Sequence, residues 1–219
     1  LDQRAKKVDA PFFLYFAPNA NHNQRNVEGI FAVPEKVGGV KIKGQSRYTD
    51  GSKAGDREDM VLDGTNVTIT AGPTWEALDP VRALSNHSSG KMGYAVAAAA
   101  AAAGASVTLV SGPTALNPPS GIRYQPVQSA KDMLAAVERE IEDCDVFIGV
   151  AAVADYRPAQ SASSKIKKQS ESVTLELVRN PDILARVAQS PKRPFTVGFA
   201  AETDQAIPNA RDKLQRKGL

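Results

Sequence analysis

Three loops directly after short apolar segments carry residues that could bind a ligand, with glycine, hydroxyl-bearing and charged residues distributed among them. They cover residues 71–93, 111–114 and 151–156. The first loop ends in Ser88-Ser89-Gly90-Lys91, where a helix is expected to begin. The first turn of a helix presents backbone N–H groups that no residue of the helix can accept, and these groups bind anions such as phosphate. The residue types therefore indicate a generic anion site.

The Gly90-Lys91 pair does not belong to a phosphate-binding P-loop. That motif requires glycine where this chain has Ser85, and a magnesium-binding hydroxyl where it has Met92. A dinucleotide-binding G-x-G-x-x-G turn is also missing, and Pro73 has no N–H to offer a pyrophosphate. These departures disfavour a P-loop nucleotidase and a nicotinamide dehydrogenase. Taken singly, each loop is also explained by ordinary turn formation and helix capping.

Alternating strands and helices position these loops. Apolar periodicity predicts strands over residues 67–70, 106–110, 146–150, 173–178 and 195–200, and helices over 90–103, 131–142, 182–189 and 207–216. The alternation is typical of an α/β fold, a three-layer, Rossmann-like, doubly wound and mostly parallel sheet. Ligands of such sheets bind beyond the carboxyl ends of the strands, where the three loops are expected.

Composition excludes several classes of partner. The chain has 27 Lys and Arg against 24 Asp and Glu, a net charge of +3 that is too small and dispersed to indicate a nucleic-acid surface. The longest apolar run, residues 94–105, is too short to span a bilayer, so no membrane is expected as a partner. The single cysteine, Cys144, cannot form an internal disulfide, and two histidines disfavour a histidine metal site. We therefore expect a cytoplasmic protein.

Seven sequence blocks, read together, resemble the bacterial phosphopantothenate-cysteine ligases, which are usually the second half of a bifunctional flavoprotein. The blocks are Thr70-Ala71-Gly72-Pro73-Thr74, Asp79-Pro80-Val81-Arg82, Ser85-Asn86-His87-Ser88-Ser89-Gly90-Lys91-Met92-Gly93, Ala151-Ala152-Val153-Ala154-Asp155-Tyr156, Lys165-Ile166-Lys167-Lys168, Asn180-Pro181-Asp182-Ile183 and Gly198-Phe199-Ala200-Ala201-Glu202-Thr203. The resemblance implies that residues 63–219 condense 4'-phosphopantothenate with L-cysteine for coenzyme A. It implies CTP and Mg²⁺ as co-substrate and metal, an acyl-cytidylate intermediate, and release of CMP and pyrophosphate.

The same resemblance implies roles for individual residues. Asn86 would hold the acyl intermediate, since a neutral amide can orient a carboxylate without attacking it. Arg82 would bind the phosphate or carboxylate of phosphopantothenate through its planar fork, although a salt bridge with Glu76 or Asp79 is the alternative. Lys165 would reach CTP from a flap that also carries Lys167 and Lys168, for which a solvated basic loop is the plainer explanation.

The nucleotide-binding residues that the resemblance implies span five of the later segments. They are Gly149, Ala151, Ala152, Asp155, Lys165, Asn180, Pro181, Asp182, Ile183, Phe199, Lys213 and Lys217. Without the resemblance, Phe199 would be assigned to the core, and Lys213 and Lys217 to an ordinary helix surface. No ligand of the metal is identified. His87 is not expected to act as a base, and Cys144 is expected to be a core thiol.

Residues 1–62 differ in character from the rest of the chain. The run Pro11-Phe12-Phe13-Leu14-Tyr15-Phe16 predicts one buried strand followed by loops, and the segment resembles a sulfatase fragment. The nucleophile motif and metal carboxylates of a sulfatase are missing, and His22 alone could not catalyse its reaction. We therefore expect a chimeric chain whose first 62 residues pack poorly against the ligase domain.

Several expectations concern the extent of the ligase domain. It is expected to be truncated at its C-terminus, to form a homodimer if the missing part were restored, and to bind no FMN, because the decarboxylase half of the bifunctional proteins is absent. An inactive nucleotide-binding remnant is the alternative to an enzyme. Hydrolysis by residues 1–62 is a third, strongly disfavoured hypothesis.

Overall fold

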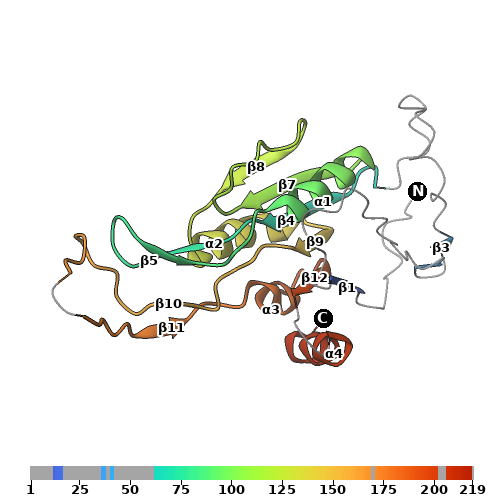
Figure 1. Cartoon of the computed structure of the whole chain (residues 1–219). Coiled ribbons are helices and arrows are strands. Elements are labelled where there is room, and N and C mark those ends of the chain that lie inside the picture. Colours follow the sequence, from blue (N-terminus) through green and yellow to red (C-terminus); the bar gives the residue numbers. More distant parts are fainter. Residues whose placement is uncertain are drawn as a thin grey trace.

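Six strands form one parallel sheet (Figure 1). They are β1 (Phe12–Phe16), β4 (Asn66–Ala71), β7 (Ser106–Ser111), β8 (Arg123–Pro126), β9 (Val146–Gly149) and β12 (Phe195–Ala201). Their order across the sheet is β1-β12-β9-β4-β7-β8, and every neighbouring pair is parallel. The computed structural model describes residues 62–168, 171–201 and 206–218, and, before them, only β1, β2 (Lys36–Val37) and β3 (Val40–Lys41).

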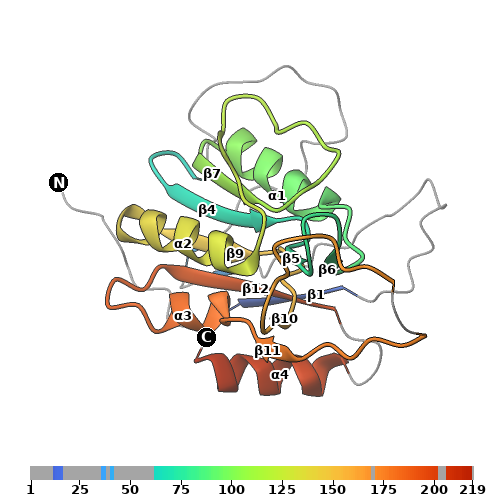
Figure 2. The same cartoon turned by 90° about the vertical axis from the view of Figure 1, so that its left-hand side faces the viewer.

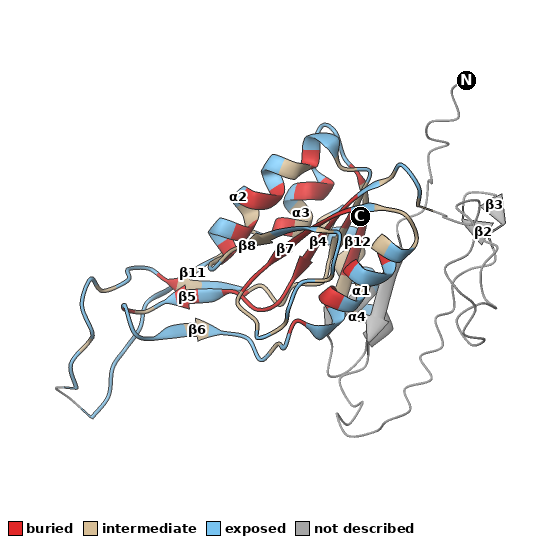
Figure 3. Cartoon of the chain, turned by 90° about the horizontal axis from the view of Figure 1, so that it is seen from above, coloured by how far each residue is buried: buried red, intermediate tan, exposed pale blue. Residues whose placement is uncertain are grey.

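The described part of the chain also contains four helices and one 3₁₀ turn. They are α1 (Lys91–Ala102), α2 (Ala130–Glu140), η2 (Ile141–Asp143), α3 (Ile183–Ala188) and α4 (Ala206–Lys217). The chain passes from β4 through α1 to β7 on one side, then from β8 through α2 back to β9 on the other side of β4. Right-handed crossovers in opposite directions place α1 and α2 on opposite faces of the sheet (Figure 3). This is the expected three-layer, doubly wound architecture.

Two apolar clusters fill the spaces between the layers. One joins β4 and β7 to α1 through Val67, Ile69, Ala71, Tyr94, Ala97, Ala100, Val107 and Leu109. The other joins the sheet to α2 and α3 through Val110, Met133, Ala136, Val137, Ile141, Phe147, Ile183 and Val187. Every residue of β4 and β7 after the first is buried, as expected where helices cover both faces of a parallel sheet (Figure 3).

Two antiparallel hairpins extend beyond the carboxyl ends of the strands (Figures 1 and 2). The first is β5 (Trp75–Ala77) with β6 (Ala83–Ser85), and the second is β10 (Tyr156–Pro158) with β11 (Leu177–Arg179). We call residues 156–179 the arm. β5 packs against β10, so the two hairpins lie together.

The structure corrects one predicted strand and adds several. Residues 173–178 were predicted to form a strand of the sheet, but only Leu177–Arg179 is a strand, and it pairs with β10 in the arm. The side chains of Val173 and Leu175 are 64% and 42% exposed, so their alternation does not mark a buried face. The strands β5, β6, β8 and β10 were not predicted, because their residues show no apolar periodicity.

The predicted strand at Phe12–Phe16 exists as β1, which lies at the edge of the sheet beside β12 and not at its centre. His22 lies outside the described residues. Across the described ranges, no helix combines the length and the apolar character needed to cross a bilayer.

Gly93 sets the distance between α1 and β4. A Cβ at this position would overlap the Cβ of Ala71 and lie 3.0 Å from its Cα. Alanine normally stabilises a helix by about 1 kcal/mol relative to glycine. We nevertheless expect Gly93→Ala to lower the free energy of unfolding by about 1–3 kcal/mol, because the helix must move away from the strand. Urea denaturation measures the difference.

Ala98→Gly, on the exposed side of α1, is the matched control that measures helix propensity alone. If Gly93→Ala were as stable as the unmodified chain, or more stable, α1 would not approach β4 this closely.

Candidate functional site

The loops that follow β4 and β9 run side by side at the point where the strand order of the sheet reverses. Ala152 N–H donates to the carbonyl of Gly72 at 2.9 Å, and Pro73 and Ala152 form an isolated parallel bridge. Ala154 N–H donates to Oγ1 of the buried Thr74 at 3.0 Å. A doubly wound sheet has its binding crevice at this reversal point. The candidate site is therefore the junction of these two loops.

Asn86 bridges the junction from the end of β6. Its Nδ2 donates to the carbonyl oxygens of Ala152 and Val153, each at 3.1 Å. Because both of these neighbours are carbonyl oxygens, which only accept hydrogen bonds, the amide atom that faces them must be Nδ2. Oδ1 must therefore face away from them. Among the described residues Oδ1 accepts no hydrogen bond, and the side chain is exposed. Asn86 is therefore fixed in orientation and has an acceptor available to a ligand.

The start of α1 lies directly beside the β4 loop. Its N-cap is Gly90, with φ of 75°, and no side chain caps this end of the helix. A Cβ on Gly90 would lie 2.6 Å from Cγ2 of Thr114 and 3.4 Å from Cα of Gly72, so only glycine allows these segments to touch. Ser88 Oγ accepts from the N–H of Gly90 at 3.3 Å, closing a local turn. Ser89 Oγ accepts from the N–H of Lys91 at 3.5 Å, so the amides that remain for an anion at the predicted site are those of the next residues of α1, Met92 and Gly93.

Asp79 and Arg82 form an ion pair at the tip of the first hairpin, with Arg82 Nη2 lying 2.5 Å from Oδ2 of Asp79. The Asp79 side chain is buried, and Oδ1 accepts from the N–H groups of Val81 and Arg82 at 2.8 Å. The Arg82 guanidinium, the largest cause, and these N–H groups hold the pKa of Asp79 well below its ordinary value despite the opposing effect of burial. Arg82 thus forms the salt bridge that was the alternative to substrate binding, and its partner is Asp79. Glu76 instead accepts from the N–H of Ala130 at 2.9 Å.

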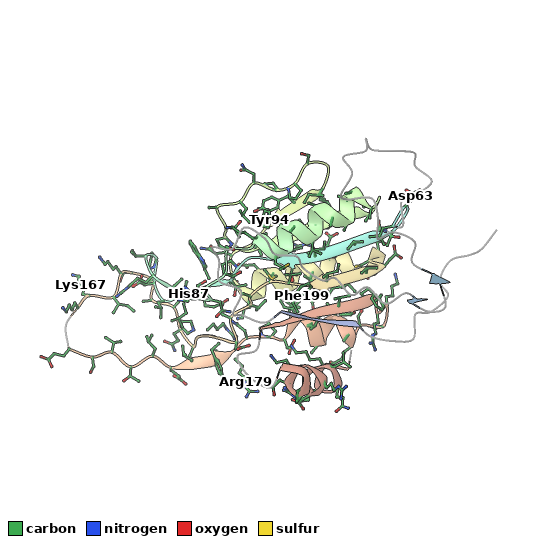
Figure 4. All side chains as sticks on the ribbon, turned by 45° about the vertical axis from the view of Figure 1, so that its right-hand side comes forward. Asp63, His87, Tyr94, Lys167, Arg179 and Phe199 are labelled. Carbon is green, nitrogen blue, oxygen red and sulfur yellow. The ribbon has the colours of Figure 1, made fainter. Side chains whose placement is uncertain are left out.

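The three flap lysines lie on the arm, and the side chains of Lys165, Lys167 and Lys168 are all exposed. Figure 4 places Lys167 near the outer end of the arm, farther from the sheet than His87 and Phe199. His87 is exposed beside Asn86. The lysines therefore project from a segment that stands beyond the crevice, as a flap would.

The segment Asn180-Pro181-Asp182-Ile183 packs against the β9 loop. Asn180 donates from its backbone N–H to the carbonyl of Asp155 and from Nδ2 to the carbonyl of Ala154, both at 2.8 Å. Asp182 is the N-cap of α3, and its Oδ2 also lies 2.7 Å from Nζ of Lys217. The structure thus brings Asp155, Asn180, Asp182 and Lys217 into one contiguous group.

The remaining predicted nucleotide residues differ in exposure. Gly149, Ala151, Ala152, Pro181, Phe199 and Lys213 are half-buried. Ile183 is only 6% exposed and belongs to the core between α2 and the sheet, so its side chain supports the turn from behind. Cys144 is half-buried, and burial raises the pKa of its thiol.

A cavity of about 620 Å³ lies elsewhere, between the β7 loop and α2. Its lining includes Gly112, Thr114, Tyr124, Asp132 and Arg139, and none of the residues predicted to bind substrate or nucleotide. Thr114 separates this cavity from the junction, because its methyl group packs against Gly72 and Gly90 on the other side. Sequence reasoning assigned no role to Thr114, and its only signal was a position in the loop after a predicted strand.

Known proteins resemble this chain over the same residues that form the site. A family model described as the DNA/pantothenate metabolism flavoprotein C-terminal domain matches residues 62–219. The coenzyme A biosynthesis bifunctional protein CoaBC of Vibrio parahaemolyticus is 55% identical over 162 residues, which are 73% of this chain and 41% of that protein. The CoaBC of Escherichia coli K12 is 54% identical over 158 residues, 70% of this chain and 39% of that protein.

A solved structure gives the same result. The crystal structure of the C-terminal domain of CoaBC superimposes with a TM-score of 0.65 at 46% identity, covering 73% of this chain and 75% of that one. The chain spans about two fifths of the length of the curated relatives, at 41% and 39%. These findings confirm the ligase-family resemblance from residue 62 onward, whereas the sulfatase resemblance of the earlier residues is not borne out.

The lowered pKa of Asp79 predicts how its contribution to stability depends on pH. A carboxyl group with a pKa below its unfolded value of 3.8 stabilises the folded chain fully above that pH, and progressively less as the pH falls toward the folded pKa. We expect the difference in free energy of unfolding between the unmodified chain and Asp79→Asn to be constant near neutral pH and to shrink below pH 3.8. Urea titrations at a series of pH values measure it. A difference that grew on acidification would contradict the assignment of this ion pair.

Proposed function

Because the chain belongs to the family of DNA/pantothenate metabolism flavoprotein C-terminal domains, we propose that residues 62–219 condense 4'-phosphopantothenate with L-cysteine. The names of these relatives refer to coenzyme A biosynthesis, and this reaction is the amide-forming step that the sequence blocks indicate. The observation that carries the proposal is the placement of Asn86 across the junction of the β4 and β9 loops. Residues from four of the seven blocks, 70–74, 85–93, 151–156 and 180–183, are in contact there.

The chemistry proposed requires two anions to meet. The carboxylate of phosphopantothenate attacks the α-phosphorus of CTP, forming an acyl-cytidylate and releasing pyrophosphate. The amine of cysteine then attacks the acyl carbon, and CMP leaves with the electron pair of the broken bond. Cationic groups must offset the repulsion in the first step. Lys165 on the arm and Lys213 and Lys217 on α4 supply such groups from two sides.

Arg82 can serve both its structural pair and a substrate. A guanidinium has five N–H donors, and in the described part of the chain Nη1 donates to no residue. The side chain of Arg82 is 47% exposed. We therefore propose that Nη1 binds the phosphate or carboxylate of phosphopantothenate while Nε and Nη2 stay with Asp79.

Asn86 is proposed to orient the reacting groups. Both N–H bonds of its amide are engaged by the carbonyls of Ala152 and Val153. Donation to the acyl group would therefore require one of these bonds to be exchanged for a bond to the substrate. Oδ1 can accept from the incoming amine without any such exchange.

Mg²⁺ would enter with the triphosphate. Within the described ranges, no three His, Cys, Asp or Glu side chains lie close enough together to hold a metal ion. Mg²⁺ keeps several waters and is commonly bound through substrate phosphates with only one or two carboxylates. The carboxylates present therefore fit a Mg²⁺ ion that would enter together with CTP. The charge of this ion would offset that of the triphosphate.

The nucleotide itself is proposed to lie along the β9 loop. Gly149, Ala151 and Ala152 form its floor, Asp155 and the Asn180–Ile183 turn hold the base and ribose, and Phe199 packs against the cytosine. A cytoplasmic location and a homodimer complete the proposal. The inactive nucleotide-binding remnant would bind CTP without forming phosphopantothenoylcysteine, so product analysis separates it from the enzyme.

Selectivity for CTP is the first expected outcome. Isothermal titration in the presence of Mg²⁺ should show CTP binding and little binding of ATP, because the family resemblance implies CTP as the nucleotide. Equal affinities for the two nucleotides would remove the base-binding part of the proposal.

Asn86→Asp should block amide formation. The new carboxylate would face the carbonyls of Ala152 and Val153 and repel the substrate carboxylate and the phosphates of CTP. We expect turnover to fall by about 100-fold or more, the usual cost of one transition-state hydrogen bond. Pyrophosphate release and phosphopantothenoylcysteine are measured separately.

Asn86→Ala is the control for a purely structural role, because it removes the bonds to the β9 loop without adding charge. If Asn86 only anchors that loop, affinity for CTP and turnover should fall together in both variants. If it acts on the reacting groups, turnover should fall far more than affinity, and an active Asn86→Asp protein would exclude it from the mechanism.

A further inference from the structure

We propose that Asp79 is a positioning residue that fixes the arm beside Lys165 and so sets the apparent affinity for the nucleotide. The inference rests on the proposed function, since it concerns how Lys165 is presented to a triphosphate. Asp79 itself need not touch any substrate. It acts through the backbone of Ile166, the residue next to Lys165.

Both backbone groups of Ile166 are bound by the Asp79–Arg82 ion pair. The N–H of Ile166 donates to Oδ2 of Asp79 at 3.1 Å, and Arg82 Nη2 donates to the carbonyl of Ile166 at 2.9 Å. These bonds join residues 87 and 84 positions apart in the chain. One ion pair therefore holds one residue of the arm at both its N–H and its carbonyl oxygen.

A second backbone bond joins the same hairpin to the arm four residues earlier. Ala162 N–H donates to the carbonyl of Leu78 at 2.9 Å, and the N–H of Leu78 donates to the carbonyl of Arg82 at 2.8 Å. Ala162 and Ile166 are half-buried, whereas the side chains between them and Lys165 itself are exposed. Beyond β10, the arm is thus hydrogen-bonded to the hairpin at two points, Ala162 and Ile166, and Lys165 precedes the second.

The chemistry of Asp79 suits this attachment better than any neutral residue would. Oδ1 completes the hairpin turn through the N–H groups of Val81 and Arg82. Oδ2 accepts at once from Nε and Nη2 of Arg82 and from Ile166. An asparagine could reproduce one of these oxygens, but its Nδ2 would face donors and could accept from none of them.

Attachment of this kind lowers the entropic cost of binding. A lysine on an untethered loop must be ordered each time a ligand binds, and that cost is subtracted from the affinity. The attachment at Ile166 orders the backbone of Lys165 in advance and leaves its side chain free to reach the phosphates. Loss of Asp79 should therefore weaken nucleotide binding more than the chemical step.

The first measurement needs no nucleotide. Hydrogen exchange at the Ile166 amide and trypsin cleavage after Lys165 both report on the attachment in the free chain. We expect both to be faster in Asp79→Asn than in the unmodified chain. Glu138→Gln is the matched control, because it removes a carboxylate from the Arg186–Glu138 ion pair of 3.1 Å on α2 and α3 and should leave both rates unchanged.

The second measurement separates positioning from stability. Asp79→Asn should raise the KM for CTP roughly 10-fold to 100-fold, the range supported by one hydrogen bond to a charged group, with a much smaller change in kcat and in the KM for cysteine. A residue needed only for folding would instead lower the active fraction, and hence the apparent kcat, at constant KM.

A backbone variant covers the case in which Asp79→Asn does not fold. Ile166→Pro removes the N–H donor but leaves the Asp79–Arg82 pair intact, and it should raise the KM for CTP in the same way. Ile166→Ala keeps the N–H and should leave that KM nearly unchanged. Equal KM values for the Pro and Ala variants would overturn the inference.

The two hypotheses fail in different ways. Unchanged exchange at Ile166 in Asp79→Asn, or faster exchange with an unchanged KM for CTP, would overturn the positioning role. An unmodified chain that binds no CTP would overturn the proposed function instead, whatever the exchange rates show.

Discussion

The site depends on the way β4 and β9 continue beside each other after the sheet has ended. Neighbouring strands normally separate at a reversal point, since their loops lead to helices on opposite faces. Here the hydrogen bond from Ala152 to Gly72 and the bridge between Ala152 and Pro73 keep the two loops together. Asn86 then attaches to the same stretch at Ala152 and Val153. Every other part of the proposed site is arranged around this paired backbone.

Close packing at three glycines makes that arrangement possible. Gly93 brings α1 against β4, and Gly90 and Gly72 allow the start of the helix to meet the β4 loop, with Thr114 filling the remaining space. The helix therefore begins where its free amides can reach an anion in the crevice. Larger side chains at these positions would separate the layers and move the amides away from the junction. Packing and binding are thus determined by the same contacts.

The sequence predicted the sheet well where strands are covered on both faces, because Val67–Thr70 and Val107–Val110 are rich in β-branched and apolar residues. It failed in the arm, where Val173 and Leu175 alternate like a buried strand but remain exposed. The attachment of Ile166 to Asp79 could not be predicted either, since it uses backbone atoms and joins residues 87 positions apart. Individual roles for Asn86 and the lysines came from the family resemblance. Spacing along the chain carries no information on which loops meet in space.

The backbone character of the arm's attachments has a consequence for how this region can evolve. Ala162 and Ile166 are held through their backbone N–H and carbonyl groups, and every residue except proline supplies both of these groups. Substitutions among the exposed residues of the arm therefore leave its attachment intact, and charge, length of side chain and polarity can change there freely. Selection can thus tune the electrostatic surface offered to a ligand while the geometry of the arm is inherited unchanged.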